Sequence, residues 1–156
     1  MELAAKLVQV DSVLACARLA LGMAHENAQQ QEKARSQGPL TPEEAHAFAA
    51  GWYAAWNAHD INAIMACYDE GISHSSPFIK KYNGTDEVAL VGKPAVRDYF
   101  ARALVRNPTL AFHPKHVATG LESLILVYTR MTGDLAAEIF FLNEARLIVR
   151  SVSHYT

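Results

Sequence analysis

The sequence has no excess of basic residues, which bears on whether it binds nucleic acid. Its 156 residues carry 14 Lys and Arg against 16 Asp and Glu, which gives a formal net charge of −2. A domain that binds nucleic acid usually presents a clustered basic surface. We therefore expect no nucleic-acid partner.

The sequence also lacks a long hydrophobic run. No segment approaches the roughly 18 consecutive apolar residues that are typical of a transmembrane helix. The apolar N-terminal stretch is interrupted by Glu2, Lys6, Asp11 and Arg18, so it does not have the core of a signal peptide. We expect a cytoplasmic protein that has no membrane partner.

Cysteine is scarce, and the common metal and cofactor motifs are missing. Cys16 and Cys67 form no CxxC pair, and we expect both to be small buried thiols. His113 and His116 do not have the i, i+2 spacing that would align two ligands on one face of a strand. There is no GxGxxG, Walker, GxSxG or HExxH motif. The sequence therefore predicts neither a metal nor a cofactor.

Hydrophobic residues are plentiful, which favours one globular domain with a real core. They make up 51% of the chain, and charged residues make up 19%. Before this domain, residues 1–38 predict a separate helical arm and linker, because Leu3, Leu7, Val10 and Leu14 begin an a/d repeat. Such an arm would either join two subunits or pack on its own domain. We expect the main domain to span residues 39–156.

The chain is organised around a helix that carries both of its tryptophans. Phe48, Trp52 and Trp56 recur every four residues, so they lie on one face of a helix and need a large apolar surface to cover them. Thr41 is a suitable N-cap, and Glu44 completes a capping box with it. The pattern predicts a helix from residue 42 to about residue 58.

The next stretch alternates short helices, a strand and loops. Asp60 can cap a short helix over residues 61–68, and a strand over residues 72–76 ends at Pro77. Residues 80–91 are polar and contain Asn83-Gly84, which indicates a loop or a loose hairpin. A further helix is expected over residues 95–105.

After Asn107 and Pro108 the hydrophobic period changes to two, which indicates strands. The short connections between these strands favour hairpins and therefore an antiparallel sheet. Helices followed by such a meander predict an α+β architecture. The expected strands cover residues 109–119, 123–132, 135–142 and 146–155.

Several of these segments together resemble a known family. They are the stretch from Trp52 to Asp60, Tyr68-Asp69-Glu70 before a strand ending in Ser76-Pro77, the stretch from Gly92 to Phe100, and the closing Ala137-Glu138, Arg150 and His154-Tyr155. In order and spacing they resemble the nuclear transport factor 2-like superfamily, in its SnoaL-like and ketosteroid-isomerase-like branch. The resemblance implies a cystatin-like cone, in which a strongly curved antiparallel sheet wraps around the long helix and encloses a pocket. It also implies a homodimer formed through the sheet.

The isomerases of this superfamily use a carboxylate base, a helix tyrosine and a protonated acid on a later strand. By the resemblance, these positions fall on Ser76, Trp52 and Glu138. Serine cannot abstract a proton unaided, and an indole N–H is only a donor. The isomerase triad is therefore not retained. The bulk of Trp52 at the pocket floor predicts a ligand that is smaller or flatter than a steroid.

Three residues could still carry acid–base chemistry. His74 lies at i−2 from Ser76 and so shares its face. Glu138, on an otherwise apolar strand, faces either the outside of the sheet or an apolar pocket that would raise its pKa, and the resemblance implies the pocket. If the turn at Thr132–Asp134 has three residues, Tyr128 pairs opposite Glu138. The other expected pocket residues are Trp52, Tyr53, Trp56, Ser76, Phe78, Tyr99, Phe140, Ser151 and Ser153.

Three kinds of function remain open at this point. The first is a protein that binds a small apolar or aromatic molecule. The second is a cofactor-independent isomerase, cyclase or dehydratase that uses His74 and Glu138. The third is a protein-interaction module or dimeric accessory subunit that uses the outer sheet face and the helical arm. A cavity with His74 and Glu138 on its wall would favour the first two over the third.

Overall fold

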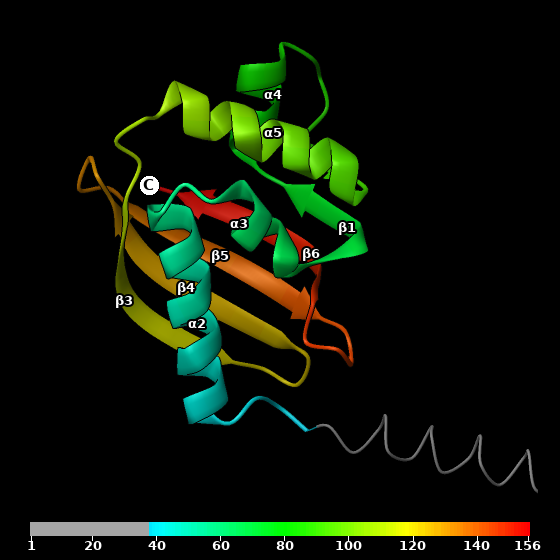
Figure 1. The fold of residues 1–156 in the computed structure, drawn as a ribbon, viewed down its shortest axis with the longest axis vertical. Helices are drawn as coiled ribbons and strands as arrows, with labels where there is room; N and C mark the ends of the chain where they lie inside the picture. The colour runs from blue at the N-terminus through cyan, green and yellow to red at the C-terminus, as the bar shows by residue number, and fades with distance from the viewer. Residues whose placement is uncertain (1–37) are drawn as a thin grey trace, which may run out of the picture. The chain divides into compact units, whose positions relative to one another are not determined.

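The computed structural model describes residues 38–156, which fold into four helices and six strands (Figure 1). The predicted arm lies outside the described residues, except for its last residue, Gly38. No helix among residues 38–156 is long and apolar enough to cross a membrane. The elements are α2 (Pro42–Asn57), α3 (Ile61–Ala66), β1 (Tyr68–Ser75), α4 (Pro77–Asn83), β2 (Ala89–Val91), α5 (Lys93–Arg106), β3 (Phe112–Thr119), β4 (Ser123–Arg130), β5 (Leu135–Leu142) and β6 (Ile148–Tyr155).

The first two helices begin where the capping residues predict. The backbone N–H of Glu44 donates to Thr41 Oγ1 at 3.2 Å, and the Glu44 carboxylate accepts from the Thr41 N–H at 2.8 Å. The side chain of Asp60 caps α3 by accepting from the backbone N–H groups of Asn62 and Ala63. These contacts satisfy donors that have no partner inside a helix. The predicted capping box is confirmed.

The expected loop or loose hairpin over residues 80–91 is only partly right, because residues 80–83 belong to α4 and residues 89–91 form β2, while residues 84–88 lie in neither. Ser76 Oγ accepts from the Phe78 N–H at 3.2 Å, and Pro77 occupies the first turn of α4, where a missing N–H costs nothing. Gly84 ends the helix with a φ of 67°, a left-handed conformation that suits glycine. Seven residues are too few for a hydrophobic period to appear, so only this cap could reveal the helix.

The six strands form one curved, unclosed sheet in the order β2-β1-β6-β5-β4-β3. The predicted hairpins β3–β4, β4–β5 and β5–β6 are antiparallel, as is β1–β2. The strands β1 and β6 pair in parallel, so the sheet is mixed and not wholly antiparallel as expected. A short hairpin turn forces the two strands that it joins to be antiparallel. No hairpin joins β1 to β6, so this pair is free to be parallel.

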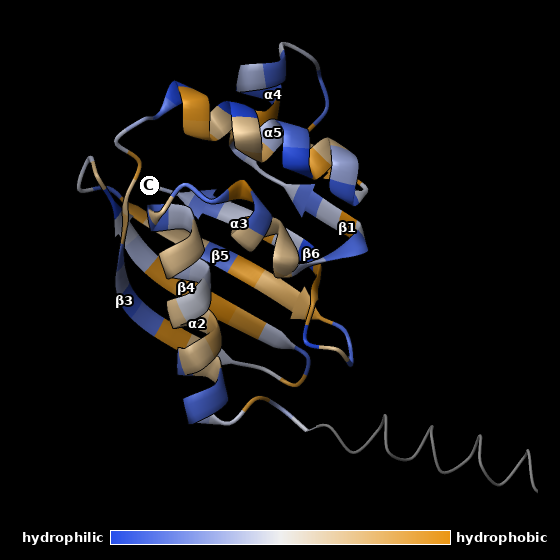
Figure 2. Cartoon of the chain, in the orientation of Figure 1, coloured by the Kyte–Doolittle hydropathy of each residue, from blue (hydrophilic) through white to orange (hydrophobic). Residues whose placement is uncertain are grey.

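The helices α2, α3 and α5 cover the concave face of the sheet (Figure 1). Buried residues alternate along the strands, as in Leu124, Leu126 and Tyr128 on β4. Figure 2 shows the hydrophobic residues of β4 and β5 beneath α2. Trp52 is packed between the sheet and the helix, and its ring stacks on Phe112 at a centroid distance of 5.5 Å. The predicted α+β fold class, with a curved sheet around the tryptophan helix, is confirmed.

Candidate functional site

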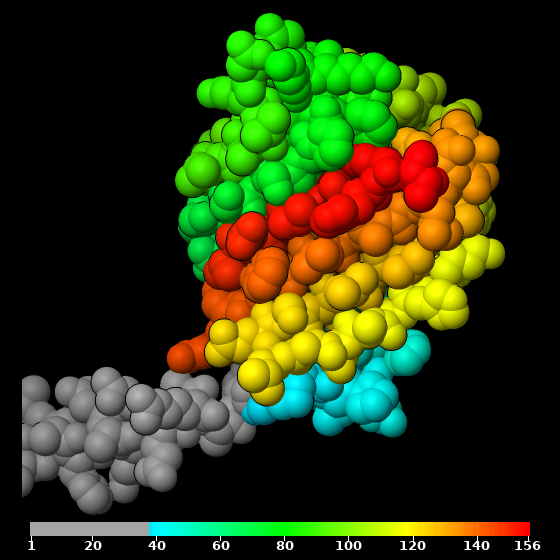
Figure 3. Space-filling model, turned by 180° about the vertical axis from the view of Figure 1, so that it is seen from behind, coloured from blue at the N-terminus to red at the C-terminus, as the bar shows by residue number. Residues whose placement is uncertain are grey.

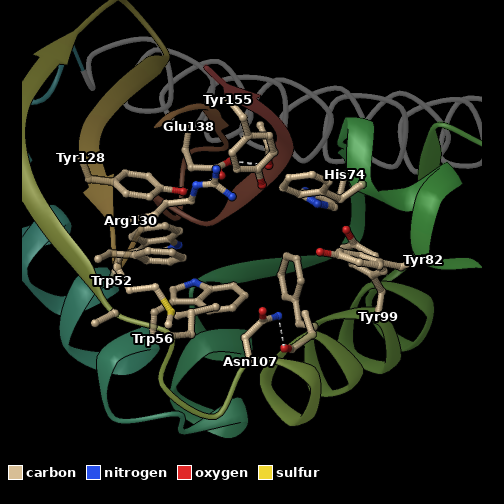
Figure 4. A pocket seen from close by; sticks show the side chains of 18 of the residues that line it. Trp52, Trp56, His74, Tyr82, Tyr99, Asn107, Tyr128, Arg130, Glu138 and Tyr155 are labelled. Carbon is tan, nitrogen blue, oxygen red and sulfur yellow. Dashed lines mark hydrogen bonds between the residues drawn. The ribbon is translucent and has the colours of Figure 1, made fainter. Parts of the chain in front are cut away.

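A cavity of about 200 Å³ lies between the helices and the concave face of the sheet (Figure 4). It is smaller than the roughly 300–1,000 Å³ of a typical drug-sized pocket. Most of its wall is aromatic, so its ligand would be largely apolar. The helix α2 contributes Trp52 and Trp56, α4 contributes Phe78 and Tyr82, and α5 contributes Tyr99 and Phe100.

The two tryptophans occupy the side of the cavity that α2 forms. Trp52 Nε1–H donates to the buried hydroxyl of Tyr68 at 3.1 Å, which fixes the orientation of the indole. Trp56 packs edge-to-face on Phe100 at a centroid distance of 4.9 Å. The ring packing leaves these bulky residues in fixed positions, so this side of the cavity is shaped in advance for a flat molecule.

Glu138 is the acidic residue of the cavity wall, and it projects from the inner face of β5. Tyr128 O–H donates to its Oε1 at 3.2 Å, and Ser153 O–H donates to its Oε2 at 2.9 Å. Burial raises the pKa of Glu138 to about 7, although the two hydroxyl donors act in the opposite direction. Burial and the nearby Glu138 raise the pKa of Tyr128 as well, so its hydroxyl stays protonated. The carboxyl group can therefore hold or release a proton near neutral pH.

His74 lies on the cavity wall at the end of β1. Its Nδ1 is 2.7 Å from Ser151 Oγ, and its ring packs against Tyr99 and Phe100. Burial lowers the pKa of His74 to about 4, so the imidazole is neutral at pH 7. On β6, which lies between β1 and β5, His74 pairs with Ser151 and Glu138 pairs with Ser153. Two strand spacings of about 4.8 Å each and an offset of two residues therefore separate their backbones. The two groups do not contact each other, and a ligand would have to lie between them.

The opening of the cavity is marked by its exposed lining residues. Met131 is 49% exposed, Thr132 is also exposed, and Asn107 is half-buried. Arg130, from the end of β4, lies beside them with its guanidinium over the Tyr155 ring. We call this group, together with Phe78 and Tyr82, the mouth of the cavity.

Four residues that were expected in the pocket do not line the cavity. Tyr53 packs on Tyr128 and points its hydroxyl at the Val127 carbonyl, 3.4 Å away. Phe140 lies under Trp52 at a centroid distance of 5.4 Å. Ser151 holds His74, and Ser76 caps α4. All four are buried behind the wall, where they position the residues that form it.

The predicted pairing of Tyr128 with Glu138 is wrong by two residues. Tyr128 pairs with Ala136, and Glu138 pairs with Leu126. The reason is that the turn is centred on Thr132 and not on Gly133, since the Arg130 N–H donates to the Asp134 carbonyl at 2.9 Å. Tyr128 still reaches Glu138, since diagonal neighbours on one face of a sheet lie within reach of a long side chain. The structure thus brings Glu138, Tyr128 and Ser153 together and leaves His74 apart.

Several lining residues were not expected from the sequence. Arg130 keeps the inward phase of Tyr128, so the two-residue period could have indicated it. Tyr82 could not be found, because it lies on a helix that was interpreted as a loop. Asn107 and Met131 lie outside regular elements, where no period exists.

A family model described as the SnoaL-like domain matches residues 49–156. The chain belongs to the SnoaL-like family. A SnoaL-like protein of unknown function from Burkholderia thailandensis is 36% identical, with a TM-score of 0.72 over 76% of this chain and 98% of its own. None of the curated proteins compared with the SnoaL-like chain matches it.

More distant structures show that the same fold occurs in proteins of different descriptions. SalBIII, an epoxide hydrolase/cyclase-like enzyme of pyran ring formation in salinomycin, is 16% identical, with a TM-score of 0.58 over 73% of this chain and 92% of its own. A protein of unknown function with a cystatin-like fold from Methylobium petroleophilum is 15% identical, with a TM-score of 0.59. The match covers 75% of this chain and 78% of that protein's chain. At this identity the likeness establishes the fold of the SnoaL-like chain, and its function must be argued from the site.

The two histidines of the third strand do not form a metal site with other residues of the described part of the domain. His113 and His116 are both exposed on the edge strand β3. Among residues 38–156, no group of three or more His, Cys, Asp or Glu side chains is placed to hold a metal ion.

Proposed function

We propose that this SnoaL-like protein binds a small, flat, mainly apolar molecule in its aromatic cavity. The observation that carries the proposal is a preformed cavity whose aromatic wall contains one isolated carboxyl group, Glu138. An aromatic wall supplies affinity, while a few fixed polar groups supply orientation. The cavity volume of about 200 Å³ supports a ligand of two or three fused rings and not one of steroid size.

The test uses a neutral aromatic probe, 2-naphthamide, followed by ligand-observed NMR. At about 0.3 kcal/mol per non-hydrogen atom, such a probe binds with a Kd of about 1 mM. Ala103 lines the cavity, so Ala103→Phe should fill part of it and weaken binding at least about tenfold. Ala95→Phe on the exposed side of the same helix is the matched control and should bind like the wild type. Equal binding by both variants, or none by the wild type, would contradict the proposal.

A second candidate is a cofactor-independent isomerase, cyclase or dehydratase. It is supported by the pKa of Glu138 at about 7, because a proton-transfer group works best when its pKa lies near the working pH. As a carboxylate, Glu138 would take a proton from one ligand atom and return it, as an acid, to another. His74 is a poor base at neutral pH, since its pKa is lowered to about 4, and it would serve as a neutral hydrogen-bonding group. Among distant structural neighbours, SalBIII is described as cyclase-like, which is compatible with this candidate.

A further inference from the structure

Arg130 is held at the mouth of the cavity by two rings that line it. Its Cζ lies 5.0 Å from the centroid of Tyr155 and 5.7 Å from that of Phe78. These rings are stacked on each other at 4.4 Å, so they form a rigid support for the guanidinium. Figure 4 shows Arg130 and Tyr155 on the same side of the cavity as Glu138. The position of this cation is therefore set before any ligand binds.

Two further cations pack on aromatic rings of the mouth. Lys81 Nζ lies 5.6 Å from the Phe78 centroid and 5.8 Å from the Tyr82 centroid. Arg106 Cζ lies 4.9 Å from the Tyr82 centroid, and its Nη2 donates to the Tyr82 carbonyl at 3.3 Å. Three positive charges are thus gathered around Phe78, Tyr82 and Tyr155, although the whole chain has a net charge of −2.

Only one carboxylate in the described part of the chain opposes these three cations. Asp134 Oδ2 accepts from Arg130 Nη2 at 2.9 Å and from Thr132 Oγ1 at 2.8 Å, and its side chain is 47% exposed. Within residues 38–156, Lys81 and Arg106 form no ion pair. Arg130 Nε–H is buried without an acceptor among the same residues, so the guanidinium keeps unused donor capacity.

The interior of the cavity opposes a negative ligand less than an ordinary carboxylate would. His74 is neutral at pH 7, and burial raises the pKa of Glu138 to about 7, so this carboxyl group is only partly ionised there. Among the described residues that line the cavity, Arg130 alone has a permanent charge. The potential therefore becomes more positive from the aromatic interior toward the mouth.

We infer that the ligand is an aromatic oxyanion, most simply a carboxylate, whose rings enter the cavity while its charged group stays at the mouth beside Arg130. This inference rests on the proposed function and adds the charge and orientation of the ligand. A guanidinium suits a planar carboxylate, because its N–H groups form charge-assisted hydrogen bonds in one plane. Lys81 and Arg106 contribute a longer-range attraction that salt would weaken.

The experiment compares 2-naphthoate with 2-naphthamide, two probes of the same shape that differ in charge. In the wild type, 2-naphthoate should bind about tenfold more tightly than 2-naphthamide at low salt. Arg130→Gln should abolish this preference by weakening 2-naphthoate alone, and Arg130→Lys should keep part of it. The binding of 2-naphthamide to each variant shows that its cavity is still folded.

Arg150→Gln is the matched control for charge and packing. Arg150 is exposed and also lies over an aromatic ring, with its Cζ 5.1 Å from the Phe141 centroid, but it does not line the cavity. This variant should keep the full preference for 2-naphthoate. Equal affinity of both probes for the wild type, or an equal loss of both in Arg130→Gln, would overturn the inference while leaving the binding cavity in place. Binding of neither probe by the wild type would contradict the proposed function as well.

Discussion

Glu138 and His74 respond to pH in opposite directions. The pKa of Glu138 rises from 4.5 to about 7 on folding, so the folded state holds the extra proton and loses stability as pH rises through that range. The pKa of His74 falls from 6.5 to about 4, so the unfolded state holds the extra proton and folding gains stability as pH rises. The two effects nearly cancel between pH 4.5 and 6.5. A flat pH–stability profile of the wild type would therefore hide two strongly perturbed residues.

Glu138→Gln should reveal the hidden titration. The variant removes the carboxyl group, so its stability should increase with pH through the His74 transition instead of staying flat. Relative to the wild type it should gain about 3 kcal/mol between pH 4.5 and pH 8. Denaturant unfolding at several pH values measures this difference, and Glu87→Gln, at an exposed position, should follow the wild type. A constant difference between Glu138→Gln and the wild type would show that Glu138 is not perturbed, and would remove the acid–base candidate.

At the scale of elements, the helix α4 links its N-terminal cap to the wall of the cavity, because it carries residues of both. Ser76 caps the helix, and the same helix carries Phe78 and Tyr82 into the mouth. The side chain of Ile79 is fully buried and fixes α4 to the core. A short helix depends on such contacts, because it is too short to be stable alone. The position of the two mouth rings therefore depends on the Ser76 hydroxyl together with the buried Ile79 side chain.

Ser76→Ala should lower both stability and affinity. Loss of the cap should cost about 1 kcal/mol of unfolding free energy, and the displaced rings should weaken 2-naphthamide binding severalfold. Thr41→Ala is the control, because it removes an equivalent cap from the exposed start of α2 at a similar cost, yet Thr41 does not line the cavity. Calorimetric unfolding and probe titration separate the two effects. Unchanged affinity in Ser76→Ala would show that α4 keeps its place without the cap.

At the scale of the molecule, the convex face of the sheet carries no helix among the described elements. Figure 3 shows this face from behind, with β6, β5 and β4 lying side by side at the surface. Ile125, Ile139 and Val152 occupy adjacent register positions across these strands, and Phe141 on β5 is 37% exposed. Such a row of apolar side chains is more typical of an interface than of a free surface. We propose that two copies of this chain pair through this face.

Ile139→Glu should weaken that pairing. A carboxylate in the middle of the apolar row would have to lose its hydration in a dimer, so the variant should be monomeric where the wild type is dimeric. Light scattering coupled to size-exclusion chromatography measures the mass of each. Leu121→Glu is the control, because Leu121 is 79% exposed in the β3–β4 turn. A monomeric wild type, or a dimeric Ile139→Glu, would leave the sheet face without this role.

Local chemistry accounts for most of the fold that could be predicted from the sequence. The caps at Thr41 and Asp60 fix helix starts, because a free N–H needs an acceptor wherever the chain goes. The two-residue period fixes which side chains of a strand share a face, while the inner position of Glu138 was expected from the family resemblance, because its strand is apolar on both faces. Helix caps and strand periodicity depend on residues that are close together in the chain, so they can be predicted from the sequence.

Long-range packing decided the rest. The sequence alone could not indicate the parallel pairing of β1 with β6, because the two strands are far apart in the sequence and no short turn joins them. It could not separate residues on the cavity wall, such as Ser153, from residues just behind it, such as Ser151, since both share one face of β6. The cavity is the space that the side chains of the helices and of the curved sheet leave unfilled. Its position therefore depends on the packing of the whole fold.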